Sequence, residues 1–207
     1  MAQNTLIYGN AEEHGQPCDM LFTDPPYEMN GKTLATILDN YTTSHLVLIT
    51  TMKQFIEFIE NSDWKLNFDF VLDGVMPKKS KSLMQPNYTH QNGFYLTKNN
   101  AKSIFNRKLR QRSDVVESNG YWPTIFHAPR NNTQQHGMAK NTDTITDILG
   151  SFNVQNVCDP FAGSGSTLVA AWELDIKCTL VENDKKTFEY LKNLASFMDT
   201  YGIEIKE

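Results

Sequence analysis

Short apolar runs alternate along the chain with amphipathic stretches. Cys18 to Thr23 is an apolar run that ends at a Pro-Pro turn, and Ser44 to Thr50 is a second run rich in leucine and β-branched residues. Runs of this length with few polar residues are typical of parallel strands buried on both faces. Residues 32–41 and 52–60 follow these two runs and have the periodicity of sheet-packing helices.

The carboxyl-terminal part repeats this alternation and is predicted to form a β-α-β unit. Its expected strands are 156–159 and 177–182, and its expected helices are 166–174 and 184–198. In the middle of the chain we expect strands at 68–72 and 93–97, with a proline-containing loop over 74–89 between them. The pattern as a whole predicts an α/β fold.

Length and composition fit one globular domain over residues 1–207. The chain has 207 residues, of which 40% are hydrophobic and 21% charged, so disorder and fibre are excluded. The net charge of -5, taken over the whole chain, argues against a nucleic-acid partner, since such domains usually carry a positive field.

Nothing in the sequence supports a metal site, a disulfide framework or a membrane segment. The three cysteines have no CxxC spacing, and the five histidines have no HxxxH or HxH spacing. The first ten residues lack a signal-peptide pattern, and no run of about 18 apolar residues occurs. We therefore expect reduced thiols, no metal, no membrane contact and a cytoplasmic location.

A glycine-rich run follows the predicted strand at 156–159 and reads Asp159-Pro160-Phe161-Ala162-Gly163-Ser164-Gly165-Ser166-Thr167. Glycines there allow the backbone to approach a ligand, and free amides at the following helix start favour an anion such as a carboxylate. Glu182 ends the next strand, near the spacing of about 20 residues at which an acid binds ribose hydroxyls. Because no lysine follows Gly165 and Leu168 replaces a third glycine, a ribose-bearing ligand is favoured over a triphosphate or a dinucleotide.

A second motif, Thr23-Asp24-Pro25-Pro26-Tyr27, follows the first predicted strand, at the edge where open α/β sheets bind ligands. Prolines lack N–H donors and interrupt helical hydrogen bonding, so the Pro25 carbonyl is not used in the backbone hydrogen bonds of a helix. Two acceptors, Asp24 and that carbonyl, beside the Tyr27 ring suit a planar amino group on a stacked base. Taken alone, the motif also fits a rigid loop with a solvated Asp and a core Tyr, and the glycine-rich run makes that alternative less favoured.

Together the two motifs resemble those of the DNA amino-methyltransferases, which use S-adenosylmethionine to methylate adenine N6 or cytosine N4. The Asp-Pro-Pro-Tyr turn precedes the glycine loop in the sequence, and this order is similar to that of the circularly permuted β class. The resemblance extends over nearly the whole chain. It implies a Rossmann-like, doubly wound, mostly parallel sheet, with S-adenosylmethionine as cofactor and double-stranded DNA as partner. RNA and protein methyltransferases with similar turns generally place the cofactor loop first.

The resemblance also implies roles for particular residues. The catalytic set would be Asp24, Pro25, Pro26 and Tyr27, acting on a flipped-out base. The cofactor would bind Asn10, Asp24, Lys140, Asp159, Phe161, Ala162, Gly163, Gly165, Ser166 and Glu182. Two positions depart from the family pattern: Asn10 replaces an acid that binds the cofactor adenine, and the segment ending at Lys140 lacks both prolines of the HPxxKP element.

A basic run in the middle of the chain answers the objection from net charge. Residues 98–112 contain no acid, and their cations are Lys98, Lys102, Arg107, Lys108, Arg110 and Arg112. Such a run is either a solvated loop or a phosphate-binding segment. It lies between the two motifs, where β-class enzymes carry their target-recognition region, so we expect a small DNA-binding insert over 98–122. Its size implies few base contacts and a short recognition sequence. The sequence leaves both a monomer and a homodimer as alternatives.

Adenine N6 is the predicted target, because DPPY is commoner in that group and SPPY in the cytosine-N4 group. Cytosine N4 stays open, and so does a non-catalytic DNA-binding module that retains the fold. Pro17-Cys18 is similar to the nucleophile motif of cytosine-C5 enzymes, but it enters a strand instead of following one. We therefore expect Cys18 to be a structural thiol.

Overall fold

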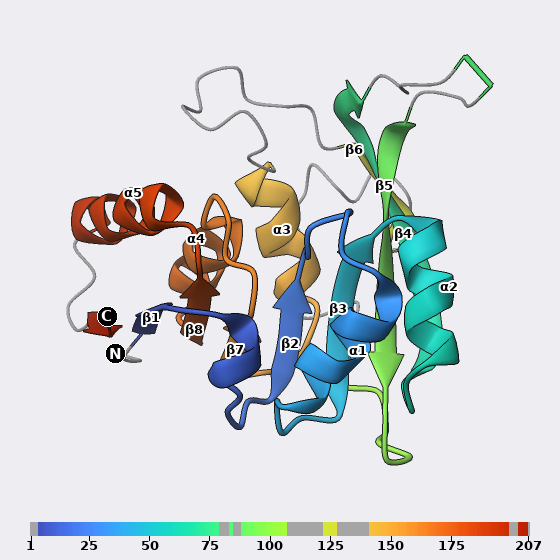
Figure 1. Ribbon diagram of the computed structural model, residues 1–207, viewed down its shortest axis with the longest axis horizontal. Helices are drawn as coiled ribbons and strands as arrows, with labels where there is room; N and C mark the ends of the chain where they lie inside the picture. Colours follow the sequence, from blue (N-terminus) through green and yellow to red (C-terminus); the bar gives the residue numbers. More distant parts are fainter. Residues whose placement is uncertain are drawn as a thin grey trace.

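A computed structural model describes residues 4–78, 83–84, 88–106, 122–127, 141–198 and 203–206. These residues form a nine-stranded sheet with helices on both faces (Figure 1). The strands are β1 (Asn4–Tyr8), β2 (Met20–Thr23), β3 (His45–Thr50), β4 (Lys65–Lys78), β5 (Tyr88–Thr97), β6 (Ile125–His127), β7 (Asn156–Asp159), β8 (Lys177–Glu182) and β9 (Ile203–Lys206). The helices are the 3-10 turn η1 (Ala11–Glu13) and α1 (Gly31–Asp39), α2 (Met52–Glu60), α3 (Thr142–Leu149), α4 (Ser166–Glu173) and α5 (Lys185–Phe197).

The strand order is β6-β4-β5-β3-β2-β7-β8-β1-β9. Among the strands described, only β5 runs antiparallel to its neighbours β3 and β4. The predicted α/β class with a mostly parallel sheet is therefore confirmed. The bounds of α2, β7 and β8 are those expected from the sequence pattern.

The predicted loop over 74–89 is too long at both ends, because β4 continues to Lys78 and β5 begins at Tyr88. Gly74 has a φ of 82°, and the β4–β5 register shifts between Asp73 and Lys78. A register shift releases backbone N–H groups from the ladder, so a strand can contain Pro77 there. The last residue of β3, Thr50, pairs with Asn92, and the β4–β5 hairpin continues past that level at the carboxyl edge of the sheet (Figure 1).

Buried apolar side chains fill both faces of the sheet, as the apolar runs predict. One cluster joins η1, α1 and α2 to the sheet, and the other joins α3, α4 and α5 to the opposite face. Phe55 of α2 stacks on Phe94 of β5 with ring centroids 3.7 Å apart. On the other face, Phe70 packs edge-to-face against Trp122 and Phe126. The molecule is thus a three-layer α/β/α structure.

Strands β2 and β7 are neighbours in the sheet although they come from opposite ends of the chain, with Leu21 paired to Cys158. The chain leaves β2 toward α1 on one face and leaves β7 toward α4 on the other. Two neighbouring parallel strands whose connections diverge in this way leave a crevice at their carboxyl ends. Both sequence motifs follow these two strands.

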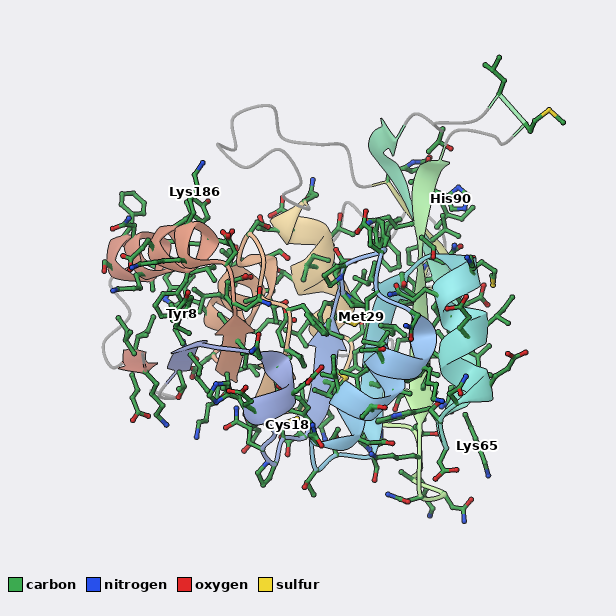
Figure 2. The ribbon with its side chains drawn as sticks, viewed as in Figure 1. Tyr8, Cys18, Met29, Lys65, His90 and Lys186 are labelled. Atoms are coloured by element: carbon green, nitrogen blue, oxygen red, sulfur yellow. The ribbon has the colours of Figure 1, made fainter. Side chains whose placement is uncertain are left out.

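The three cysteines are free thiols, and Figure 2 labels Cys18 at the lower edge of the sheet, away from the carboxyl ends of the parallel strands. None of the helices in the described parts of the chain is long and apolar enough to cross a membrane.

A substitution at Gly93 tests the packing of the second cluster. Gly93 pairs with Phe70 across β4 and β5, and a Cβ at this position would overlap the Phe70 ring. Because that ring is held by Trp122 and Phe126, we expect Gly93→Ala to lower the free energy of unfolding by about 1–3 kcal/mol in urea denaturation. Thr89→Ala, at an exposed position of the same strand, should change it by less than about 0.5 kcal/mol. Equal stability of the two variants would contradict this account.

Candidate active site

A pocket of about 530 Å³ opens at the carboxyl ends of β2, β7 and β8. Its walls are the Asp-Pro-Pro-Tyr turn after β2, the glycine loop after β7 and the end of β8. This is the volume and placement typical of small-molecule sites in open α/β sheets. The predicted site residues that line it are Asp24, Pro25, Pro26, Tyr27, Asp159, Phe161, Ala162, Gly163, Ser166 and Glu182.

Asp159 ties the two motifs together. It is only 3% exposed, and its Oδ1 accepts hydrogen bonds from Thr23 Oγ1 at 2.8 Å and from the Phe161 N–H at 3.1 Å. Its Oδ2 accepts from Thr167 Oγ1 at 2.6 Å. A buried carboxylate needs such donors to replace water. The bonds join the end of β2, the glycine loop and the first turn of α4 to the end of β7.

Glu182 holds the other side of the glycine loop. The Gly163 N–H donates to its Oε2 at 2.9 Å, and the Asp184 N–H donates to its Oε1 at 2.8 Å. Each carboxylate oxygen has two acceptor sites, so Glu182 can also accept bonds from ligand hydroxyls. The side chain is 9% exposed and lines the pocket.

Two glycines of the loop adopt left-handed conformations, Gly163 with a φ of 51° and Gly165 with a φ of 81°. Gly165 is the N-cap residue of α4, and a Cβ there would lie 2.6 Å from Leu191 Cδ2 of α5. With no side chain to cap the helix, the first-turn amides of α4 remain for an anionic ligand group. Gly165 itself is not part of the pocket wall.

The Asp-Pro-Pro-Tyr turn is held by its second proline carbonyl. The Pro26 oxygen accepts from the Met29 N–H at 3.1 Å and from Gln54 Nε2 at 3.0 Å. Within the described chain, no group donates to the Pro25 carbonyl, although Pro25 lines the pocket. The turn therefore offers the Pro25 oxygen, and not the Pro26 oxygen, as an acceptor.

Tyr27 and Asp24 are coupled at the pocket wall. Burial raises the pKa of the Tyr27 phenol above its ordinary value, and the charge of Asp24 together with a hydrogen bond to its carboxylate raises this pKa further. The phenol is therefore neutral at any physiological pH and donates to Asp24. An ionised carboxylate has about four acceptor sites, so this bond leaves Asp24 able to accept from a ligand.

Asn10 is exposed and does not line the pocket, although its neighbours Gly9 and Ala11 do. The structure therefore does not bring this predicted adenine-binding residue into the site.

The two predicted DNA-binding cations in the described part of the chain, Lys98 and Lys102, do not line the pocket. Lys98 follows the end of β5, which lies at the edge of the sheet where the parallel strands begin. Its Nζ lies 3.5 Å from Asp39 Oδ1 and 4.7 Å from the centroid of the Trp64 ring. Lys102 is exposed in the segment that follows. The other predicted cations, and the predicted cofactor ligand of the HPxxKP-like element, lie outside the described residues; they are Arg107, Lys108, Arg110, Arg112 and Lys140.

Several residues of the site were not predicted. Thr23 and Thr167 had a usable signal, because each is a hydroxyl residue within a quoted motif next to a strand end. Gln91 of β5 and Ile145 of α3 also line the pocket but belong to segments with no motif. Only strand pairing and helix packing bring them there.

The described residues contain no group of three or more His, Cys, Asp or Glu arranged to hold a metal ion.

The model of the N6/N4 methyltransferase family, described as DNA methylase, matches residues 30–206. The match includes the glycine loop and Glu182 and begins after the Asp-Pro-Pro-Tyr turn. No curated protein matches the chain.

Solved structures share the fold at low sequence identity. M1.HpyAVI in complex with SAM is similar with a TM-score of 0.69 and 17% identity, covering 92% of this chain and 99% of that one. TTHA0409 from Thermus thermophilus, complexed with S-adenosyl-L-methionine, has a TM-score of 0.70 and 14% identity, with 99% and 98% covered. The cytosine-N4-specific PvuII DNA methyltransferase has a TM-score of 0.68 and 11% identity, with 99% and 96% covered.

The bond between Thr167 and Asp159 is open to a direct test. Thr167→Val keeps the side-chain shape but removes one donor from a buried carboxylate, so we expect the free energy of unfolding to fall by about 1.5–3 kcal/mol. Thr167→Ser keeps the hydroxyl and should retain most of the stability. Denaturant unfolding of the three proteins measures the difference, and a valine variant as stable as the serine variant would show that the bond does not stabilise the loop.

Proposed function

The chain belongs to the DNA methylase family of N6 and N4 methyltransferases, and we propose that it methylates the exocyclic N6 of adenine in double-stranded DNA. Family membership makes it a DNA methyltransferase that uses S-adenosylmethionine. The observation that carries the proposal is the meeting of the Asp-Pro-Pro-Tyr turn and the glycine loop in one pocket. Methyl transfer needs an acceptor site and a cofactor site side by side.

The cofactor half of the pocket has the donors and acceptors that S-adenosylmethionine needs. Glu182 would accept bonds from the ribose hydroxyls, and the first-turn amides of α4 would bind the methionine carboxylate. The space beside Gly163 is open: a Cβ built there would have the Phe161 oxygen, at 3.8 Å, as its nearest neighbour. Because glycine has no side chain, a ligand can approach the backbone closely at this point. When bound, the cofactor supplies an activated methyl group on its sulfonium sulfur.

Asp24 and the Pro25 carbonyl are proposed to act on the target amino group. That nitrogen is a poor nucleophile because its lone pair is delocalised into the ring. If the Asp24 carboxylate and the Pro25 oxygen accept its two N–H groups, the lone pair becomes localised and directed at the incoming methyl group. The N–C bond would form as the bond between the methyl carbon and the sulfonium sulfur breaks, and one N–H proton would then pass to solvent. Positioning and charge stabilisation would supply most of the catalysis.

The target base must leave the duplex to reach this pocket, because a stacked and paired base is inaccessible. Tyr27 is half-buried beside Asp24 and is the proposed stacking partner of the flipped base. Phosphate contacts are proposed for Arg107, Lys108, Arg110 and Arg112 of the basic run. Lys98 is not proposed as a contact, since it is paired with Asp39.

The product of the reaction decides the target base. Unmethylated DNA incubated with the protein and S-adenosylmethionine should yield N6-methyladenine in nucleoside mass spectrometry. The DPPY sequence supports adenine, whereas the fold shared with a cytosine-N4 enzyme keeps N4-methylcytosine as the second candidate. Detecting N4-methylcytosine would overturn the adenine assignment, and finding neither product would contradict the proposed activity.

Asp24→Ala separates catalysis from cofactor binding. Removing one of the two acceptors should lower the rate of methyl transfer by about 100-fold or more. The affinity for S-adenosylmethionine, measured by calorimetry, should fall far less than the rate, because Asp24 is one of several expected cofactor contacts and Glu182 and the glycine loop are unchanged. Asp63→Ala, at an exposed position after α2, is the matched control and should transfer methyl groups at the wild-type rate. Full activity of the Asp24 variant would rule out the proposed mechanism.

A further inference from the structure

The side chain of Gln54 joins α2 to the Asp-Pro-Pro-Tyr turn. Gln54 lies in the first turn of α2 and is 2% exposed. Its Nε2 donates to the Pro26 carbonyl at 3.0 Å and to the Met29 carbonyl at 2.6 Å. Its Oε1 accepts from the hydroxyl of Thr50, the last residue of β3. Figure 2 labels Met29 in the loop that leads into α1.

These partners permit a single orientation of the Gln54 amide. Two backbone carbonyls can only accept, so the NH₂ end must face the turn, and both of its hydrogens are used there. The opposite end then faces the Thr50 hydroxyl, which can donate. A buried amide whose nitrogen and oxygen both have hydrogen-bond partners is rigid, because rotation would leave these polar atoms without partners and without water.

The same face of α2 also fixes the next residues of the chain. Glu57 Oε2 accepts from the Gly31 N–H at 3.1 Å, and a Cβ on Gly31 would overlap the backbone nitrogen of Phe58. Positions 54, 57 and 58 have the i, i+3, i+4 spacing of one helical face. That face of α2 therefore holds the backbone from Pro26 to Gly31 in place.

The turn is thus held on both sides of its reactive groups. On one side, Thr23 is bonded to Asp159, and on the other side Pro26 is bonded to Gln54. Asp24 and Pro25 lie between these two fixed points, and the proline rings already fix φ at two positions. Little freedom remains for the direction of the Pro25 carbonyl.

We infer that Gln54 is a positioning residue for methyl transfer, which it serves by fixing the turn so that the Asp24 carboxylate and the Pro25 carbonyl face the target amino group together. This inference rests on the proposed function of the turn. Gln54 itself does not line the pocket, so its effect is exerted through the backbone. Small displacements of reacting groups are costly, since about 1 Å of misplacement can lower a rate by about 100-fold.

Single-turnover methyl transfer tests the inference, with wild type measured first on unmethylated DNA. Gln54→Leu removes both donors at similar volume and should lower the transfer rate by about 10- to 100-fold. Its affinity for S-adenosylmethionine should be unchanged, because no cofactor-binding group is altered. Asn61→Ala is the control: it also removes an amide-to-carbonyl bond of α2, from Asn61 Nδ2 to the Glu57 carbonyl at 2.8 Å, and should keep the wild-type rate.

A pH profile distinguishes positioning from a general loss of structure. Gln54→Glu puts a carboxylate against two carbonyls, but its protonated form has one O–H that can donate to one of them. Its transfer rate relative to wild type should therefore recover as the pH is lowered, while Gln54→Leu should show no such recovery. Thr50→Val should also lower the transfer rate, because the Gln54 amide loses the hydrogen bond from the Thr50 hydroxyl. Thr50→Ser keeps a hydroxyl and should keep the wild-type rate.

The outcomes are decisive in both directions. A Gln54→Leu rate equal to wild type, or a loss matched by lost cofactor binding, would overturn the inference. If Gln54→Leu fails to fold, the Thr50 pair decides: equal rates for the valine and serine variants would overturn it. If wild type itself transfers no methyl group, the proposed function fails instead, so the two failures are distinguishable.

Discussion

The hydrogen bond between Thr23 and Asp159 is the constraint on which the site depends. It joins residues 136 positions apart and lies where β2 and β7 pair side by side. One strand delivers the Asp-Pro-Pro-Tyr turn and the other delivers the glycine loop. Because Asp159 also binds Thr167 and the Phe161 N–H, a single buried carboxylate sets the distance between the proposed acceptor half and the proposed cofactor half of the pocket.

Acidic side chains organise this pocket mainly by accepting bonds from the protein's own backbone and hydroxyl groups. Asp159 and Glu182 each hold a loop in place, and Asp24 accepts from Tyr27. This use of acids explains part of the net charge of -5 without implying a surface that repels DNA. The carboxylates of Asp159 and Glu182 are buried and are held by donors of the protein itself.

The sequence predicted the parts of the molecule in which local pattern and tertiary packing agree. The apolar runs predicted β7 and β8, and the periodicity of residues 52–60 predicted α2. Prediction failed where tertiary contacts decide: the β4–β5 hairpin continues past Gly74 through a register shift. Nothing in the sequence indicated that Lys98 pairs with Asp39. Both motifs of the site were visible in the sequence. The structural roles of Asp159 and Gln54 were not, because their partners lie in distant segments.

The pairing of β2 with β7 also has a consequence for folding during synthesis. While the amino-terminal half emerges from the ribosome, β2 can pair with β3 but still lacks its other neighbour. An unpaired central edge is prone to association with other chains, and closing a loop of this length is slow compared with forming local contacts. The nascent protein therefore carries an exposed strand edge until β7 arrives, and the proposed cofactor pocket cannot form before β7, α4 and β8 have all been translated.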